Sequence, residues 1–159
     1  MPGRELHTRM LSAEERSKLL KDVEELDQRH ADRRDAPECV RRLKNAEASF
    51  VGTEDEQYFY YELSFEQFHV VQNLLLEGSD SEEAMRKLEE ALDAAKKGDD
   101  PEWTNYMHGT MAYMKNDPEL LESFIKAGEL NEKTLQKLHD GLVKRGKPDY
   151  GLDYQGMED

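Results

Sequence analysis

The chain has 159 residues, and its 36 acidic and 22 basic side chains give a formal net charge of −14 at pH 7. Only 36 % of the residues are hydrophobic, and the lone cysteine, Cys39, excludes both an intrachain disulfide and a zinc cluster built from several thiolates. The sequence has no run of roughly 20 apolar residues that would span a bilayer, and no apolar signal segment follows Met1. We therefore expect a cytoplasmic protein with no membrane partner.

Both the composition and the helix-capping residues favour helices. Nineteen leucines outnumber six Val, one Ile and five Thr, the β-branched residues that strands prefer. Capping-box pairs and acids that precede a first-turn proline mark helix starts at Ser12–Glu15, Thr53–Glu56, Ser79–Glu82, Asp100–Pro101 and Asp117–Pro118. Glycines, which suit the left-handed conformation of a helix end, mark stops at Gly52, Gly78, Gly98, Gly128 and Gly146.

These marks predict a single all-α domain of about seven helices joined by short loops. The expected helices cover residues 12–33, 37–50, 54–77, 80–97, 101–115, 118–127 and 132–145. Because short connections place successive helices antiparallel, the natural product is a series of hairpins. The expected parts are an N-terminal pair over 12–50, two hairpins over 54–128, a C-terminal helix over 131–148 and an extended tail over 149–159.

The segment 54–77 is the expected centre of the fold. Six of the thirteen aromatic residues of the chain fall within it, namely Tyr58, Phe59, Tyr60, Tyr61, Phe65 and Phe68. A helix with so many aromatics has large side chains on more than one side, and we therefore expect it to be buried all round.

A weak repeat connects the two central hairpins. A shift of 38 residues aligns Phe65 with Trp103 and Phe68 with Tyr106, and a shift of 37 aligns Leu88 with Ile125. Over about residues 60–130 this pattern resembles the tetratricopeptide superfamily, whose units begin W-x2-L-G-x2-Y and continue A-x3-F-x2-A before a proline. Met107 and Thr110 replace the glycine and tyrosine of that pattern. An alternative is that any two antiparallel helix pairs share such spacing through packing.

The tetratricopeptide resemblance implies a right-handed stack of hairpins with flanking helices as caps. It also implies binding of a protein or peptide on a concave face lined by the first helix of each pair, and it implies no catalytic activity. On that face we predict four binding residues, namely Tyr60, Gln67, Asn105 and His108. The alternative interpretation is that these are ordinary surface or interhelix polar side chains.

Charge layout bears on the choice of partner. Residues 53–100 carry fourteen acidic and four basic groups, whereas residues 131–148 carry five basic and two acidic groups. This layout argues against nucleic-acid binding, which needs a concentrated basic face. The acidic surface either serves solubility or selects a basic protein partner, and a second functional hypothesis is an immunity-type antagonist that covers a basic surface. Whether the chain is a monomer or a homodimer stays open.

No group of residues specifies a reaction, so we expect a non-enzyme without catalytic residue, cofactor or metal. Glu66 and His69 form a Glu-x-x-His on one helix, the spacing at which ferritin-like proteins present two iron ligands. That dinuclear site needs a second such pair, and the nearest, Asp27 with His30, lacks the glutamate. A helical metal-dependent enzyme using Glu66 and His69 is therefore the third hypothesis. Cys39 has no neighbouring histidine and is expected to be an ordinary buried side chain.

Overall fold

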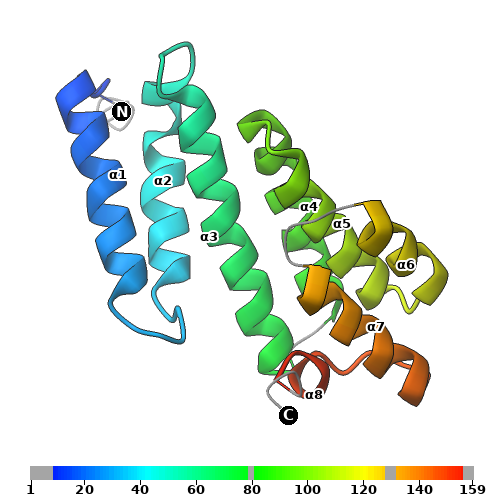
Figure 1. Cartoon of the computed structure of the whole chain (residues 1–159). Helices are drawn as coiled ribbons and strands as arrows, with labels where there is room; N and C mark the ends of the chain where they lie inside the picture. Colours follow the sequence, from blue (N-terminus) through cyan, green and yellow to red (C-terminus); the bar gives the residue numbers. More distant parts are fainter. Residues whose placement is uncertain (1–8, 79–80, 128–131, 156–159) are drawn as a thin grey trace.

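The computed structural model describes residues 9–78, 81–127 and 132–155, and within these ranges it contains eight α-helices and no strand. They are α1 (Ala13–Gln28), α2 (Ala36–Phe50), α3 (Glu56–Leu76), α4 (Ser81–Gly98), α5 (Pro101–Met114), α6 (Pro118–Ala127), α7 (Glu132–Arg145) and α8 (Tyr150–Gln155). Successive helices pack antiparallel in chain order, as Figure 1 shows. The all-α prediction is confirmed. None of these helices is both long and apolar enough to cross a membrane.

Several predicted helix ends are confirmed by hydrogen bonds. Ser12 and Glu15 form the capping box of α1, and Asp100 accepts from the Trp103 backbone N–H at 3.1 Å to begin α5. At α3, by contrast, Thr53 belongs to the preceding turn, and the helix begins after Asp55. The predicted marks Ser79 and Gly128 lie outside the described residues.

Two helix ends differ from the predictions for physical reasons. The first helix ends at Gln28 instead of residue 33, because the chain turns through Arg33, which adopts a left-handed φ of 56°. Gly98 remains helical, and Asp99 takes the left-handed conformation instead. A Cβ atom on Gly98 would lie 2.9 Å from the Tyr61 backbone nitrogen, so this glycine permits the close approach of α4 to α3.

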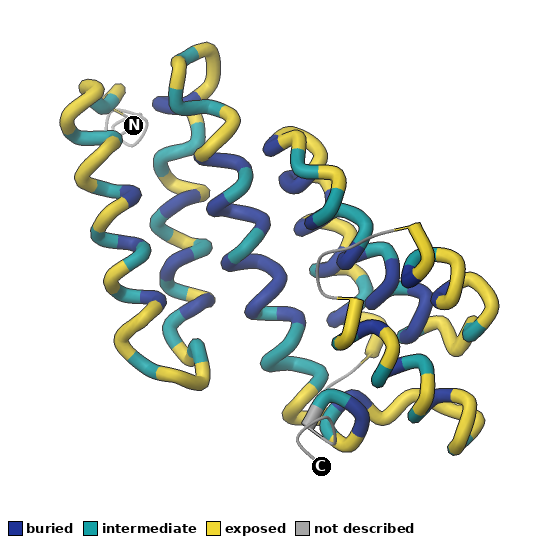
Figure 2. The backbone as a smooth tube through the Cα atoms, in the orientation of Figure 1, coloured by how far each residue is buried: buried dark blue, intermediate teal, exposed yellow. Residues whose placement is uncertain are grey.

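The middle of α3, from Phe59 to Val71, is largely buried, as its aromatic content predicted, whereas both ends of the helix are more exposed (Figure 2). It contacts α1, α2, α4 and α8, and it belongs to both hydrophobic cores of the molecule. One core joins α1 and α2 to the first half of α3, through Val23, Leu43 and Phe59. The other core joins the second half of α3 to the helices that follow. The two halves of the stack therefore depend on the same helix.

The tail expected to be extended forms the short helix α8, and polar contacts hold it in place. Tyr113 donates to Asp153 Oδ2 at 2.5 Å and accepts from the Asp149 backbone N–H at 2.7 Å. Arg145 also pairs with Asp153, whose carboxylate packs directly against Gly141. These partners are distant in sequence, so hydrophobic periodicity gave no sign of the helix.

Replacing Asp153 with alanine should release α8. The change leaves Tyr113 and Arg145 without their partner, and a buried group that loses its hydrogen bond costs about 1–3 kcal/mol. Urea unfolding should show a destabilisation of that order, and hydrogen exchange should show faster exchange over residues 150–155. Leu152→Ala is the control, since that side chain lies on the same helix and is 60 % exposed. Native-like protection in Asp153→Ala would contradict this account.

Candidate functional site

Two polar features lie on different sides of α3, at the same level of the helix. Glu66 and His69 are one turn apart and face α1, whereas Gln67 and Val70, each one residue later, line a groove beside α2 and α4. Neighbouring helical residues point about 100° apart, which places the two pairs on separate faces. Helix α3 thus supplies side chains to both features.

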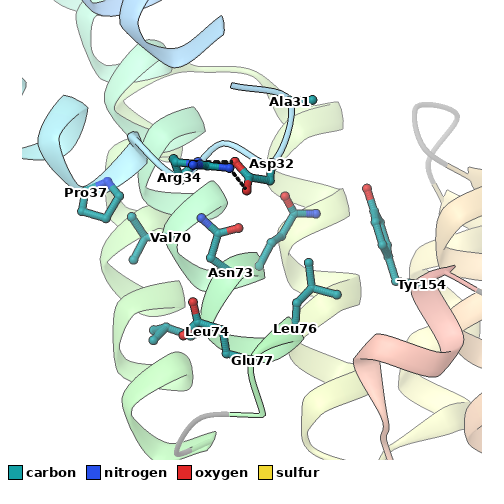
Figure 3. Close-up of a pocket in the computed structure, with 11 residues that line it drawn as sticks. Ala31, Asp32, Arg34, Pro37, Val70, Asn73, Leu74, Leu76, Glu77 and Tyr154 are labelled. Atoms are coloured by element: carbon teal, nitrogen blue, oxygen red, sulfur yellow. Dashed lines mark hydrogen bonds and ion pairs between the residues drawn. The ribbon is translucent and has the colours of Figure 1, made fainter. Parts of the chain in front are cut away.

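The groove consists of two adjoining pockets that share Pro37 and Val70, with volumes of about 300 and 550 Å³. The smaller, inner pocket is lined by Pro37, Val40, Gln67, Val70, Lys87 and Glu90. The larger, outer pocket extends past the C-terminal end of α3 to Tyr154 of α8 (Figure 3). We call the two pockets together the α3 groove.

Apolar walls and one unused acceptor characterise the inner pocket. Pro37, Val40 and Val70 supply the apolar surface, and Lys87 and Glu90 supply charges from α4. Gln67 is only 8 % exposed, and its Oε1 atom has no hydrogen-bond partner in the described part of the chain. A buried acceptor without a partner is unfavourable by about 1–3 kcal/mol, so this pocket suits a ligand that brings an N–H or O–H donor.

The outer pocket is bounded by a tightly held loop. In Figure 3 the Arg34 guanidinium pairs with Asp32 at 3.0 Å above the side chains of α3. The Asn73 amide donates to the Arg33 carbonyl at 3.1 Å and fixes this loop to α3. Leu76 is exposed at the end of the helix. This half of the groove combines apolar contact area with fixed polar groups.

The structure does not bring the four predicted binding residues together on one surface. Tyr60 lies on α3 with its hydroxyl donating to Glu47 Oε2 at 2.8 Å, and Gln67 lines the groove. Asn105 donates to the Phe124 carbonyl of α6 at 2.8 Å, and His108 stacks on the Phe124 ring at 5.5 Å. Of the four, only Gln67 combines a groove position with a free polar atom. The binding roles of all four remain predictions.

A buried polar cluster, formed by Asp27 of α1 with Glu66 and His69 of α3, occupies the other side of α3. His69 Nδ1 lies 3.5 Å from Asp27 Oδ1 and 3.9 Å from Glu66 Oε1. The three side chains are 11 %, 4 % and 1 % exposed, in the order His69, Asp27, Glu66. Among the described residues, none of these three atoms has a hydrogen-bond partner outside the cluster. Arg33 pairs with the other carboxylate oxygen of Asp27.

Burial dominates the electrostatics of this region. It raises the pKa of Glu66 to about 9, helped by the hydrogen bond and charge of Asp27, and it lowers the pKa of His69 to about 4. One turn earlier, burial and the charge of Glu24 raise the pKa of Glu62 to about 7. Near pH 7 the protein itself therefore favours a neutral Glu66 and a neutral His69.

Cys39 lies close enough to feel the same charges. Burial, followed by the charges of Glu66 and Asp27, raises the pKa of its thiol to about 12. Its Sγ contacts the Val23 carbonyl at 3.6 Å, and the side chain is inaccessible to solvent. A thiolate nucleophile is thus disfavoured at this position, in agreement with the expected ordinary buried side chain.

Sequence reasoning identified Glu66 and His69 but missed Asp27 as their partner. The buried residues of α1 are Leu20, Val23 and Asp27. Asp27 follows Val23 by four residues, one helical turn, and so extends the buried stripe. The signal that was available is this position: an acid at a core-facing position of an otherwise amphipathic helix.

No protein-family model matches the chain, and neither a curated protein nor a solved structure shows significant similarity to it. The tetratricopeptide resemblance stays a prediction from the spacing of residues 60–130. Function is therefore inferred from the geometry and chemistry on the two sides of α3.

Glu62→Gln should stabilise the protein at alkaline pH. The pKa of Glu62 is about 7 in the folded chain against about 4.5 when unfolded, so the native carboxyl holds a proton that the unfolded chain loses between these values. Wild-type stability consequently falls as pH rises from 4.5 to 7, whereas glutamine has no proton to lose. We expect the variant to gain at least about 1 kcal/mol in urea unfolding at pH 8 and little at pH 4.5.

The matched control is Glu47→Gln on α2. At Glu47 burial, which raises the pKa, is outweighed by the hydrogen bond from Tyr60 and the charge of Lys44, so the pKa is lowered. This control should therefore not gain stability at pH 8. A Glu62→Gln variant with wild-type stability at both pH values would show that Glu62 is solvated.

Proposed function

We propose that the protein is an interaction scaffold that binds a short peptide segment of a partner protein in the α3 groove. The observation that supports this most directly is the unpaired Oε1 of Gln67, buried beside the apolar walls formed by Pro37, Val40 and Val70. Helices in sequential antiparallel contact are compatible with the proposed right-handed, tetratricopeptide-like stack, in which α1, α2 and α7 act as caps. In this proposal the chain carries no catalytic activity.

The chemistry of the groove selects the ligand. An apolar side chain would fill the inner pocket, and an N–H donor beside it would bind Gln67 Oε1. Lys87 and Glu90 of the same pocket carry opposite charges, so the net charge of −14 on the chain is what favours Lys or Arg as the donor. The proposed ligand is therefore a segment in which an apolar residue lies next to a basic one.

The binding free energy that the groove can supply indicates how long the bound peptide must be. Burial of one aliphatic side chain contributes about 1.5–3 kcal/mol, and one hydrogen bond adds about 0.5–1.5 kcal/mol. Micromolar binding needs about 8 kcal/mol after the loss of rotational and translational freedom. A ligand of that affinity must extend from the inner pocket into the outer one, past Leu74 toward Tyr154.

Selection of a displayed library of random short peptides on the full-length protein tests the groove. We expect enriched peptides to pair an apolar residue with Lys or Arg, and their affinity, measured by fluorescence anisotropy, to fall at least about tenfold in Val70→Asp because a charge then occupies the apolar wall. Gln67→Leu should weaken binding about 3–10-fold through loss of one hydrogen bond. Val143→Asp is the matched control, since that valine is 59 % exposed on α7.

A salt series separates this proposal from the antagonist hypothesis. Contacts with the apolar wall should persist as ionic strength rises, whereas binding to the acidic surface alone should weaken steeply. If the enriched peptides bind Val70→Asp as tightly as the wild type and dissociate at high ionic strength, the acidic surface and not the groove is the binding site. If the wild-type protein enriches no peptide above the Val70→Asp background, the groove is not a peptide site.

A further inference from the structure

The geometry points to a binding site for one divalent transition-metal ion between α1 and α3, with Asp27 Oδ1, Glu66 Oε1 and His69 Nδ1 as the protein ligands. The inference is independent of the peptide groove. It also departs from the expectation of no metal, because the third ligand comes from a helix that the sequence alone did not place beside Glu66 and His69.

Convergence of the three atoms is the first support. They lie within 4.8 Å of one another, and the two shortest separations are 3.5 and 3.9 Å. At a metal–ligand distance of about 2.1 Å, two ligands of a tetrahedral ion are about 3.4 Å apart. Small side-chain rotations would bring all three atoms to coordination distance of a shared centre.

Lack of any other partner is the second support. Each of the three atoms is buried and has no hydrogen-bond partner outside the cluster among the described residues. When the two acids are ionised, their lone pairs and that of the imidazole face one another in a water-poor interior and repel, and each unsatisfied group is unfavourable by roughly 1–3 kcal/mol. A cation at their centre would satisfy all three at once.

The surrounding residues orient the ligands toward that centre. Arg33 holds the Oδ2 atom of Asp27, which leaves Oδ1 directed at His69. The Phe65 ring packs against the His69 imidazole in a T-shaped contact at 4.3 Å and fixes its plane. Contacts of this kind, which set the direction of a ligand atom, typically accompany metal sites in proteins.

Charge also favours a divalent ion. Three acidic side chains, Asp27, Glu62 and Glu66, are buried here, and Arg33 forms an ion pair with Asp27. A doubly charged cation would balance the set when all three are ionised. One imidazole nitrogen with two carboxylate oxygens suits ions of intermediate softness, such as Mn²⁺, Fe²⁺, Co²⁺ and Zn²⁺, more than Ca²⁺ or Mg²⁺.

Such an ion would join the N-terminal hairpin to the rest of the stack. Asp27 belongs to α1, whereas Glu66 and His69 belong to α3, so coordination would cross-link the two helices, in addition to the hydrogen bond from Tyr58 to Glu24. Because the ligands are brought together only in the folded chain, binding should stabilise the native state.

Metal titration of the full-length, chelator-treated protein tests the site, with Mn²⁺, Co²⁺ and Zn²⁺ as separate probes. We expect calorimetry to show one ion bound per chain and the melting temperature to rise by about 5–10 °C at a free metal concentration about 100-fold above Kd. Glu66→Gln should weaken binding at least about tenfold, since an amide oxygen replaces a carboxylate ligand. Glu47→Gln, which alters a half-buried glutamate outside the cluster, should retain wild-type binding.

A spectroscopic measurement on the wild-type chain removes any dependence on how the variant folds. Substoichiometric Mn²⁺ should broaden the amide resonances of Asp27, Glu66 and His69, and it should spare those of α7, which lies across the stack from α1 (Figure 1). An unchanged melting temperature with all three ions at millimolar concentration would overturn the site. Broadening centred on other acidic residues, or wild-type affinity in Glu66→Gln, would do the same.

Discussion

Burial of the middle of α3, between Phe59 and Val71, is the constraint on which the rest of the structure depends. In this middle part little surface is left for water, so a buried polar side chain there needs a partner inside the protein. The Ser64 hydroxyl has two such partners, because it accepts a hydrogen bond from Trp103 Nε1 at 2.9 Å and donates one to the Tyr61 carbonyl at 2.7 Å. Glu66, Gln67 and His69 each retain a buried atom that is not satisfied by any conventional donor or acceptor of the described residues. Those three residues therefore mark where the fold leaves binding capacity unused.

The groove and the polar cluster are separate sites, but one loop borders both. Arg33 pairs through its guanidinium with Asp27 in the cluster, and its carbonyl accepts from Asn73, which lines the outer pocket. The same residue adopts a left-handed φ of 56°, unusual for a side chain of its size. Its contacts on both sides hold it there, and the shape of the loop beside the groove is consequently set partly by the position of Asp27.

Most of the architecture could be predicted from the local sequence, because the ends of a helix depend on a few neighbouring capping residues, prolines and glycines. Ser12, Asp100 and Asp117 accept backbone hydrogen bonds at the helix starts they were predicted to mark. The local sequence did not predict the structure where contacts between distant residues determine it. Arg33 ends a helical turn without glycine, and α8 forms because Asp153 meets Tyr113 and Arg145, which precede it by 40 and 8 residues.

The candidate sites follow the same division. Glu66 and His69 share one helix, so their common face was predictable from the spacing of three residues. Asp27 was not recognised, because which face of α1 turns inward is decided by packing: the buried stripe runs through Leu20, Val23 and Asp27. Gln67 was predicted as a binding residue, yet nothing in the sequence distinguished it from Asn105, whose amide is already bonded to Phe124.

Stability alone does not account for the polar cluster. Unsatisfied buried atoms are unfavourable by roughly 1–3 kcal/mol each, and a domain of this size is stable by only about 5–15 kcal/mol in total. Replacing buried ionisable groups with apolar ones of similar volume often leaves a protein equally or more stable. The aromatic packing along α3, such as Phe68 against Trp103 and Tyr106, offsets the penalty without removing it. Two acids and a histidine in this position therefore favour the proposed cation site, in which one atom of each side chain would act as a ligand.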